Sequence, residues 1–84
     1  MYMHLGERIS VNDTNVIGVF DLENTTIGPD TRNYLNTLEQ EGKVVNVSDD
    51  MPKSFVVCME NGQEIAYISA ISVSTLRKRS KTLF

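Results

Sequence analysis

Four basic residues near the C-terminus of the sequence are able to bind phosphate groups. They are Arg77, Lys78, Arg79 and Lys81, and residues 75–84 contain no acidic residue. Lysine and arginine supply much of the affinity of proteins for nucleic acids because they neutralise phosphates. The remaining four basic and all eleven acidic residues lie in residues 1–74, so the net charge is −7 there and +4 in residues 75–84.

Three interpretations of this charge asymmetry are open. The positive end could contact an anion or a nucleic acid, or it could bind the acidic part of a neighbouring subunit. It could also be a solvated helix end, since cations near a helix C-terminus favour the helix dipole.

The other residue types that could do chemistry stand apart from one another. The only cysteine, Cys58, lies in the apolar run SFVVCME and is expected to be a small buried side chain, because nothing places the only histidine, His4, beside it. Asp49 and Asp50 precede a proline, where acidic residues are typical of a solvated turn. The sequence has no Cys/His metal pattern and no glycine-rich phosphate loop. We therefore expect a protein that is not an enzyme and that uses no cofactor, metal or small-molecule substrate.

The length of 84 residues predicts one domain, spanning residues 1–84, with a small core. The opening MYMHLGERIS lacks the basic and apolar regions of a signal peptide, and no apolar run is long enough to cross a membrane. A cytoplasmic protein without a membrane partner is the expectation.

Hydrophobic patterning and turn residues predict strands over residues 2–5, 8–11, 16–22, 43–47, 54–60 and 63–70. Pro29 and Gly42 are typical of the start and the end of a helix. Ser72 is a plausible cap for a second helix, and Asn61-Gly62 favours a two-residue hairpin turn. The apolar side of the second helix is predicted to comprise Val73, Leu76 and Leu83, with Ser80 at the same spacing.

The resulting order, β-β-β-α-β-β-β-α, predicts an α+β domain with a small, mostly antiparallel sheet, a central helix and a C-terminal helix. Several of the predicted strands are apolar on both faces, whereas two short helices can cover about one face of a sheet. Another copy of the chain would cover the other face, so we expect a homo-oligomer.

Three segments of the sequence resemble a known family. MYMHLGERISV, VIGVFDL and SFVVCMENGQEIAYISAISVSTLRKR are similar to the small bacterial extracellular matrix regulators called Rem proteins, and most similar to their RemB-like branch. The resemblance implies a cytoplasmic protein that assembles into ring-like homo-oligomers. In the RemA-like branch it also implies a DNA-binding transcriptional activator of matrix genes in biofilms, in which arginines from two loops contact phosphates.

This sequence departs from the family pattern in both loops. The position before the strand at residues 16–22 is Asn15, and the loop before residues 54–60 reads Asp50-Met51-Pro52-Lys53. The predicted DNA-contacting residues are therefore Arg77, Lys78, Arg79, Lys81, Lys53 and Arg8. The alternative is an oligomeric interaction or scaffold protein that does not bind DNA directly.

Overall fold

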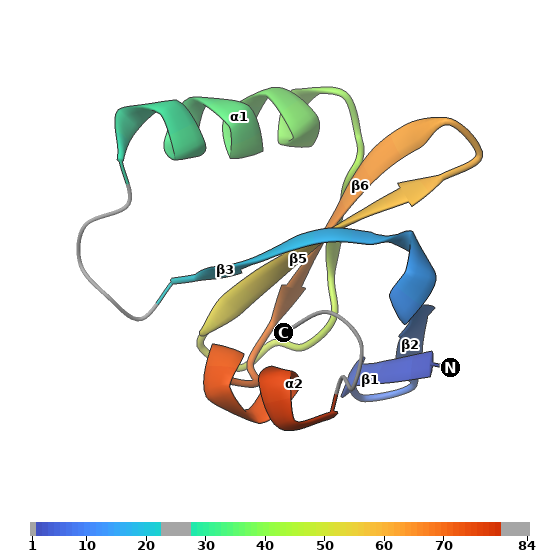
Figure 1. The fold of residues 1–84 in the computed structure, drawn as a ribbon. Coiled ribbons are helices and arrows are strands. Elements are labelled where there is room, and N and C mark those ends of the chain that lie inside the picture. Colours follow the sequence, from blue (N-terminus) through green and yellow to red (C-terminus); the bar gives the residue numbers. More distant parts are fainter. Residues whose placement is uncertain (1, 23–27, 80–84) are drawn as a thin grey trace.

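The computed structural model of the chain describes residues 2–22 and 28–79. Its elements in chain order are β1 (Tyr2–Gly6), β2 (Ile9–Asn12), the short 3₁₀ helix η1 (Asp13–Asn15), β3 (Val16–Asp21), α1 (Pro29–Gln40), β4 (Val44–Asn46), β5 (Ser54–Glu60), β6 (Gln63–Ser69) and α2 (Val73–Arg79) (Figure 1). The predicted α+β class and the predicted order of strands and helices are confirmed. The element boundaries differ from the predicted ones by one residue at several ends, and residues 13–15 form η1 where only a turn was predicted.

Four strands form the main sheet in the order β3-β5-β6-β4. The neighbours β3 and β5, and β5 and β6, are antiparallel, whereas β4 runs parallel to β6. The β5–β6 hairpin turns at Asn61 and Gly62, whose φ angles are 52° and 77°. Positive φ at both positions is what the Asn-Gly pair predicted, so this hairpin is confirmed.

The first two strands do not join the main sheet, although the sequence predicted a single one. β1 and β2 form a separate two-stranded sheet that packs over one face of the larger sheet. The alternation of β1 explains this position, because Met3 and Leu5 are buried while Tyr2 and His4 are exposed. A two-stranded hairpin needs such packing to be stable.

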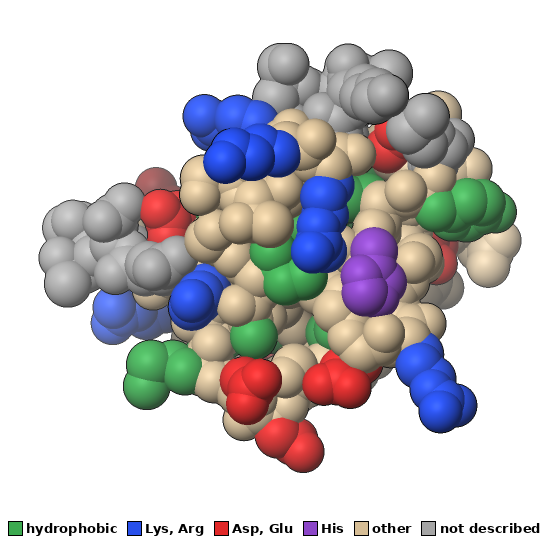
Figure 2. Space-filling model, turned by 90° about the horizontal axis from the view of Figure 1, so that it is seen from below, with side chains coloured by type: hydrophobic (Ala, Val, Ile, Leu, Met, Phe, Trp, Pro, Cys, Tyr) green, Lys and Arg blue, Asp and Glu red, His purple; other side chains and the backbone are tan. Residues whose placement is uncertain are grey.

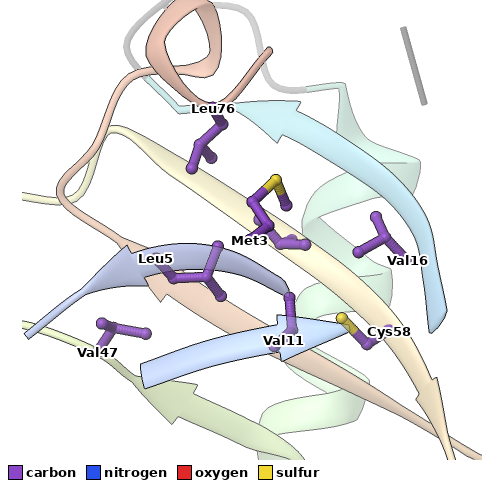
Figure 3. Close-up of a cluster of buried hydrophobic side chains, with 8 residues drawn as sticks. Met3, Leu5, Val11, Val16, Val47, Cys58 and Leu76 are labelled. Carbon is purple, nitrogen blue, oxygen red and sulfur yellow. The ribbon is translucent and has the colours of Figure 1, made fainter. Parts of the chain in front are cut away.

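The main hydrophobic cluster lies between this hairpin, α2 and the main sheet. Figure 3 shows side chains from opposite ends of the chain pointing toward one another here. The buried members are Met3, Leu5, Val11, Val16, Val47, Val56, Cys58 and Leu76.

The two helices lie on opposite faces of the main sheet (Figure 1). The sequence predicted that both helices would cover one face, but the β1–β2 hairpin shares one face with α2, so α1 is left to cover the other. α1 contacts β4 and β6 and has one buried side chain, Leu38. α1 therefore covers mainly β4 and β6 on this face of the sheet. On β3, the side chains of Ile17 and Phe20 remain 56% and 40% exposed.

Candidate nucleic-acid interface

The basic residues predicted to contact DNA are positioned mainly by α2. The first turn of α2 is capped by Ser72, whose Oγ accepts a hydrogen bond from the backbone nitrogen of Thr75 at 3.3 Å. Leu76 is completely buried in the main cluster and anchors the helix to the rest of the molecule. The three residues that follow Leu76 are Arg77, Lys78 and Arg79, and all three are exposed. We call these three residues the basic end of α2.

The basic end of α2 is joined to the N-terminal hairpin. Nη1 of Arg79 donates a hydrogen bond to the backbone oxygen of His4 at 2.9 Å. The two residues are 75 positions apart in the sequence, so this contact depends on the packing of α2 against β1. Arg79 is thus held in place on the surface while it remains accessible to an anion.

The other predicted contact residues lie outside α2. Lys53 is exposed at the end of the loop before β5, and its backbone nitrogen donates to the backbone oxygen of Ser69 at 2.8 Å. Arg8 is exposed in the turn between β1 and β2. Lys81 lies outside the described residues, as do Ser80 and Leu83.

Acidic residues share the surface that carries these basic groups. Figure 2 shows Lys and Arg side chains spread over one face of the molecule and a group of Asp and Glu side chains at its lower edge. Asp49 and Asp50 precede β5, and Asp50 is exposed, as are Met51 and Pro52 that follow it. Asn15 is also exposed, at the end of η1. Three basic side chains are therefore adjacent at the basic end of α2, and acidic residues lie on the same surface.

The residues considered for catalysis are not arranged for it. Cys58 is completely buried, and burial raises the pKa of its thiol to about 11, with a further contribution from the nearby negative charge of Glu60. His4 is exposed, and its Nε2 lies 3.0 Å from the backbone oxygen of Glu7. A thiol with a raised pKa carries little nucleophilic thiolate at neutral pH.

Two tyrosines are hydrogen-bonded to carboxylates. Tyr34 on α1 donates to Glu64 on β6, and Tyr67 on β6 donates to Glu60 on β5. Burial and the neighbouring carboxylate raise the pKa of Tyr34 to about 12, and the same causes raise the pKa of Tyr67. These pairs join elements of the fold, since the Tyr34 contact holds α1 to the sheet.

No cluster of three or more metal-binding side chains occurs in residues 2–22 and 28–79. Within the same ranges, neither helix has the length and the apolar character required to span a membrane.

A second surface feature lies between α1 and β3, away from the basic end of α2. It is an apolar groove of about 350 Å³, whose floor includes the stacked rings of Phe20 and Phe55, with centroids 4.7 Å apart. The sequence predicted an uncovered apolar face but did not indicate which strands would form it. The apolar residues of VIGVFD fall on both faces of the strand, a pattern that predicts a central strand. This prediction is wrong, because β3 lies at an edge of the sheet.

No protein-family model matches the chain. The chain is, however, 36% identical over 84 residues to extracellular matrix regulatory protein B of Bacillus subtilis (strain 168). The match covers the whole of this chain and 95% of the relative.

With this similarity and its small α+β fold, the chain belongs to the family of small bacterial extracellular matrix regulatory proteins. Within that family it is a RemB-like protein, as the sequence segments at its two ends had indicated.

Proposed function

We propose that this chain is a homo-oligomeric, DNA-binding transcriptional regulator of extracellular matrix and biofilm genes that acts in the cytoplasm. The name of the Bacillus relative supports a role in extracellular matrix regulation. The observation that carries the DNA-binding part of the proposal is the row of three exposed cationic side chains on α2, placed beside β1 by the bond from Arg79 to His4.

The contacts to DNA would be made to phosphates. Exposed Arg and Lys side chains at the end of a short helix position a protein on the DNA backbone, while base edges are read by elements that enter a groove. Three such contacts from one subunit give weak binding. A ring-like assembly presents the basic end of α2 many times, and the high effective concentration of the linked copies then raises the overall affinity.

An interaction or scaffold protein without direct DNA binding is the second candidate. The acidic pair Asp49-Asp50 favours it, because these residues lie in the loop where the family resemblance implied arginines. In this case the basic end of α2 would dock on an acidic surface of another subunit or of a partner protein.

The test is a gel shift with a double-stranded DNA fragment at low and at moderate salt concentration. Wild-type protein is expected to shift the fragment in a salt-sensitive manner, and the triple variant Arg77→Glu/Lys78→Glu/Arg79→Glu is expected to lose the shift. The quadruple variant Arg32→Glu/Asn36→Glu/Gln40→Glu/Lys43→Glu is the matched control, since it makes the same total charge change away from α2 and avoids the predicted DNA-contacting residues. It should leave most of the shift intact.

The outcome separates the two candidates when light scattering is run on the same samples. An oligomer that gives no shift at low salt would exclude DNA binding and leave the scaffold function. A loss of the shift as large for the control as for the α2 variant would show that the basic end of α2 is not the DNA-binding surface.

A further inference from the structure

Strand β3 forms one open edge of the main sheet. It is six residues long and contains neither proline nor a basic residue, whereas β4 at the other edge has three residues. Monomeric proteins usually protect an edge by making it short, by charges, by proline or by a bulge. The bulge in β3 lies at Ile17, between Val16 and Gly18, and residues 18–21 pair regularly with β5.

On the side away from β5, β3 has no partner strand among residues 2–22 and 28–79. In an antiparallel pair, residues that exchange hydrogen bonds alternate with residues that direct their N–H and C=O groups away from the partner strand. Leu22 donates its N–H to the backbone oxygen of Lys53 at 2.9 Å, so these two residues form a hydrogen-bonded pair. Phe20 and Phe55 lie two residues further along their strands and form the next pair of this kind. Val19 therefore directs its N–H and C=O away from β5, toward the open side of the sheet.

Apolar side chains line the same part of the surface. Ile17 and Phe20 on β3 are 56% and 40% exposed. Ile17 and Phe20 line the groove beside α1, where Asp30 is the only charged lining residue in the part of the chain that the structure describes. An extended partner strand with apolar side chains on one face would form backbone hydrogen bonds with this edge and would also bury these side chains.

We propose that the open edge of β3 pairs with β3 of a second copy of this chain, antiparallel and about a two-fold axis near Val19. This pairing rests on the homo-oligomer proposed above, and it would be a two-fold contact in addition to the contacts that close a ring. The two four-stranded sheets would then form one continuous sheet of eight strands. A two-fold contact uses the same surface of both copies, so the strand must be complementary to itself.

The sequence of β3 meets this requirement. With Val19 opposite Val19 of the second copy, Asp21 lies opposite Ile17, and the two Asp21 carboxylates do not face each other. Phe20 lies opposite Gly18 of the second copy. In each copy the Phe20 ring covers Gly18, because two ring atoms lie 3.1 and 3.2 Å from where a Cβ on Gly18 would be. The Phe20 rings of the two copies therefore come together on one face of the joined sheet.

The first experiment compares molar masses by light scattering across a concentration series. Wild-type protein is expected to have at least twice the chain mass of 9.4 kDa. Ile17→Glu places a negative charge opposite Asp21 of the second copy, where like charges repel, and should reduce the mass at least twofold. Met51→Glu is the control, because Met51 is 82% exposed in the loop before β5 and its substitution should leave the mass unchanged.

The second experiment measures hydrogen exchange of the Val19 amide by NMR. Pairing with a second copy is expected to slow this exchange by about tenfold or more at high protein concentration, relative to dilute protein or to Ile17→Glu. This measurement on wild-type protein holds even if Ile17→Glu fails to fold.

The proposal is overturned if the wild-type protein is a monomer, if Ile17→Glu keeps the wild-type mass, or if the Val19 amide exchanges at the same rate at all concentrations. An equal loss of mass in Met51→Glu would also overturn it and would place the contact in the loop before β5. These readouts need no DNA, so they are independent of the gel shift that tests the proposed function.

Discussion

The guanidinium of Arg79 donates a hydrogen bond to the backbone oxygen of His4 and so joins the last described residue of α2 to strand β1. Its neighbour Lys78 is exposed and makes no such bond within the part of the chain that the structure describes. One arginine of the basic end of α2 is therefore both a structural contact and a candidate phosphate contact, while the adjacent lysine is a candidate phosphate contact alone.

We expect Arg79→Ala and Lys78→Ala to differ in stability but not in the sign of their effect on DNA binding. Each should make the slope of log K against log salt concentration shallower by about 0.9 for every phosphate that is no longer neutralised. Only Arg79→Ala should also lower the free energy of unfolding, by about 0.5–1.5 kcal/mol, because it removes the bond to His4. Fluorescence anisotropy with labelled DNA and urea unfolding measure the two effects. Equal unfolding free energies for the two variants would contradict the structural role of Arg79.

Ser69→Ala is expected to destabilise the fold by about 1–3 kcal/mol. Ser69 is completely buried, and its Oγ donates to the backbone oxygen of Leu5 at 2.6 Å and accepts from the backbone nitrogen of Ile71 at 3.0 Å. Alanine would leave both backbone groups without this partner in the interior. Urea unfolding measures the change, and Ser10→Ala on the exposed side of β2 serves as the control, with an expected change within about 0.5 kcal/mol.

Leu76→Ala should lower the free energy of unfolding by about 2–5 kcal/mol, since it removes a completely buried side chain from the main cluster and leaves a cavity. The same substitution should weaken DNA binding, because Leu76 holds the basic end of α2 in position. Ser74→Ala on the exposed side of α2 is the comparison in the same unfolding assay. If the two variants unfold at the same urea concentration, α2 is not anchored by Leu76.

Stability is expected to fall as the pH rises from about 9 to about 11. The pKa of Cys58 is about 11 in the folded chain against 9.0 for an ordinary thiol. Between these values the unfolded chain loses a proton that the folded chain retains, so the stabilisation is complete below pH 9 and is lost as the pH approaches 11. Urea unfolding across this range measures the fall. In Cys58→Ala the pH dependence between 9 and 10 should be weaker, and an unchanged dependence there would exclude Cys58 as its source.

The local elements of the fold could be predicted because their causes lie within a few residues. Asn61-Gly62 favours a tight turn between two strands, since both residues accept positive φ. Pro29 starts α1 and Ser72 caps α2 for equally local reasons. The apolar run SFVVCME predicted a strand and also predicted that Cys58 would be buried, and its complete burial confirms this.

The candidate site was predicted in part. The exposed basic end of α2 follows from charges that are adjacent in the sequence, and Lys53 and Arg8 are exposed as a surface contact requires. The bond from Arg79 to His4 could not be predicted, because it joins residues 75 positions apart. The apolar groove could not be located for the same reason, as it depends on where α1 comes to rest above the sheet.

The sequence by itself therefore determined the order of the strands and helices, the hairpin at Asn61-Gly62 and the concentration of positive charge at one end. Backbone preferences, hydrophobic alternation and charge act over short distances along the chain, so they can be read from neighbouring residues. Only the tertiary structure decided that β1 and β2 form a sheet of their own, that β4 runs parallel to β6, and that β3 is left as an open edge beside an apolar groove. These features arise from the burial of apolar surface, which is non-directional and can be satisfied by many pairings until the whole chain is packed.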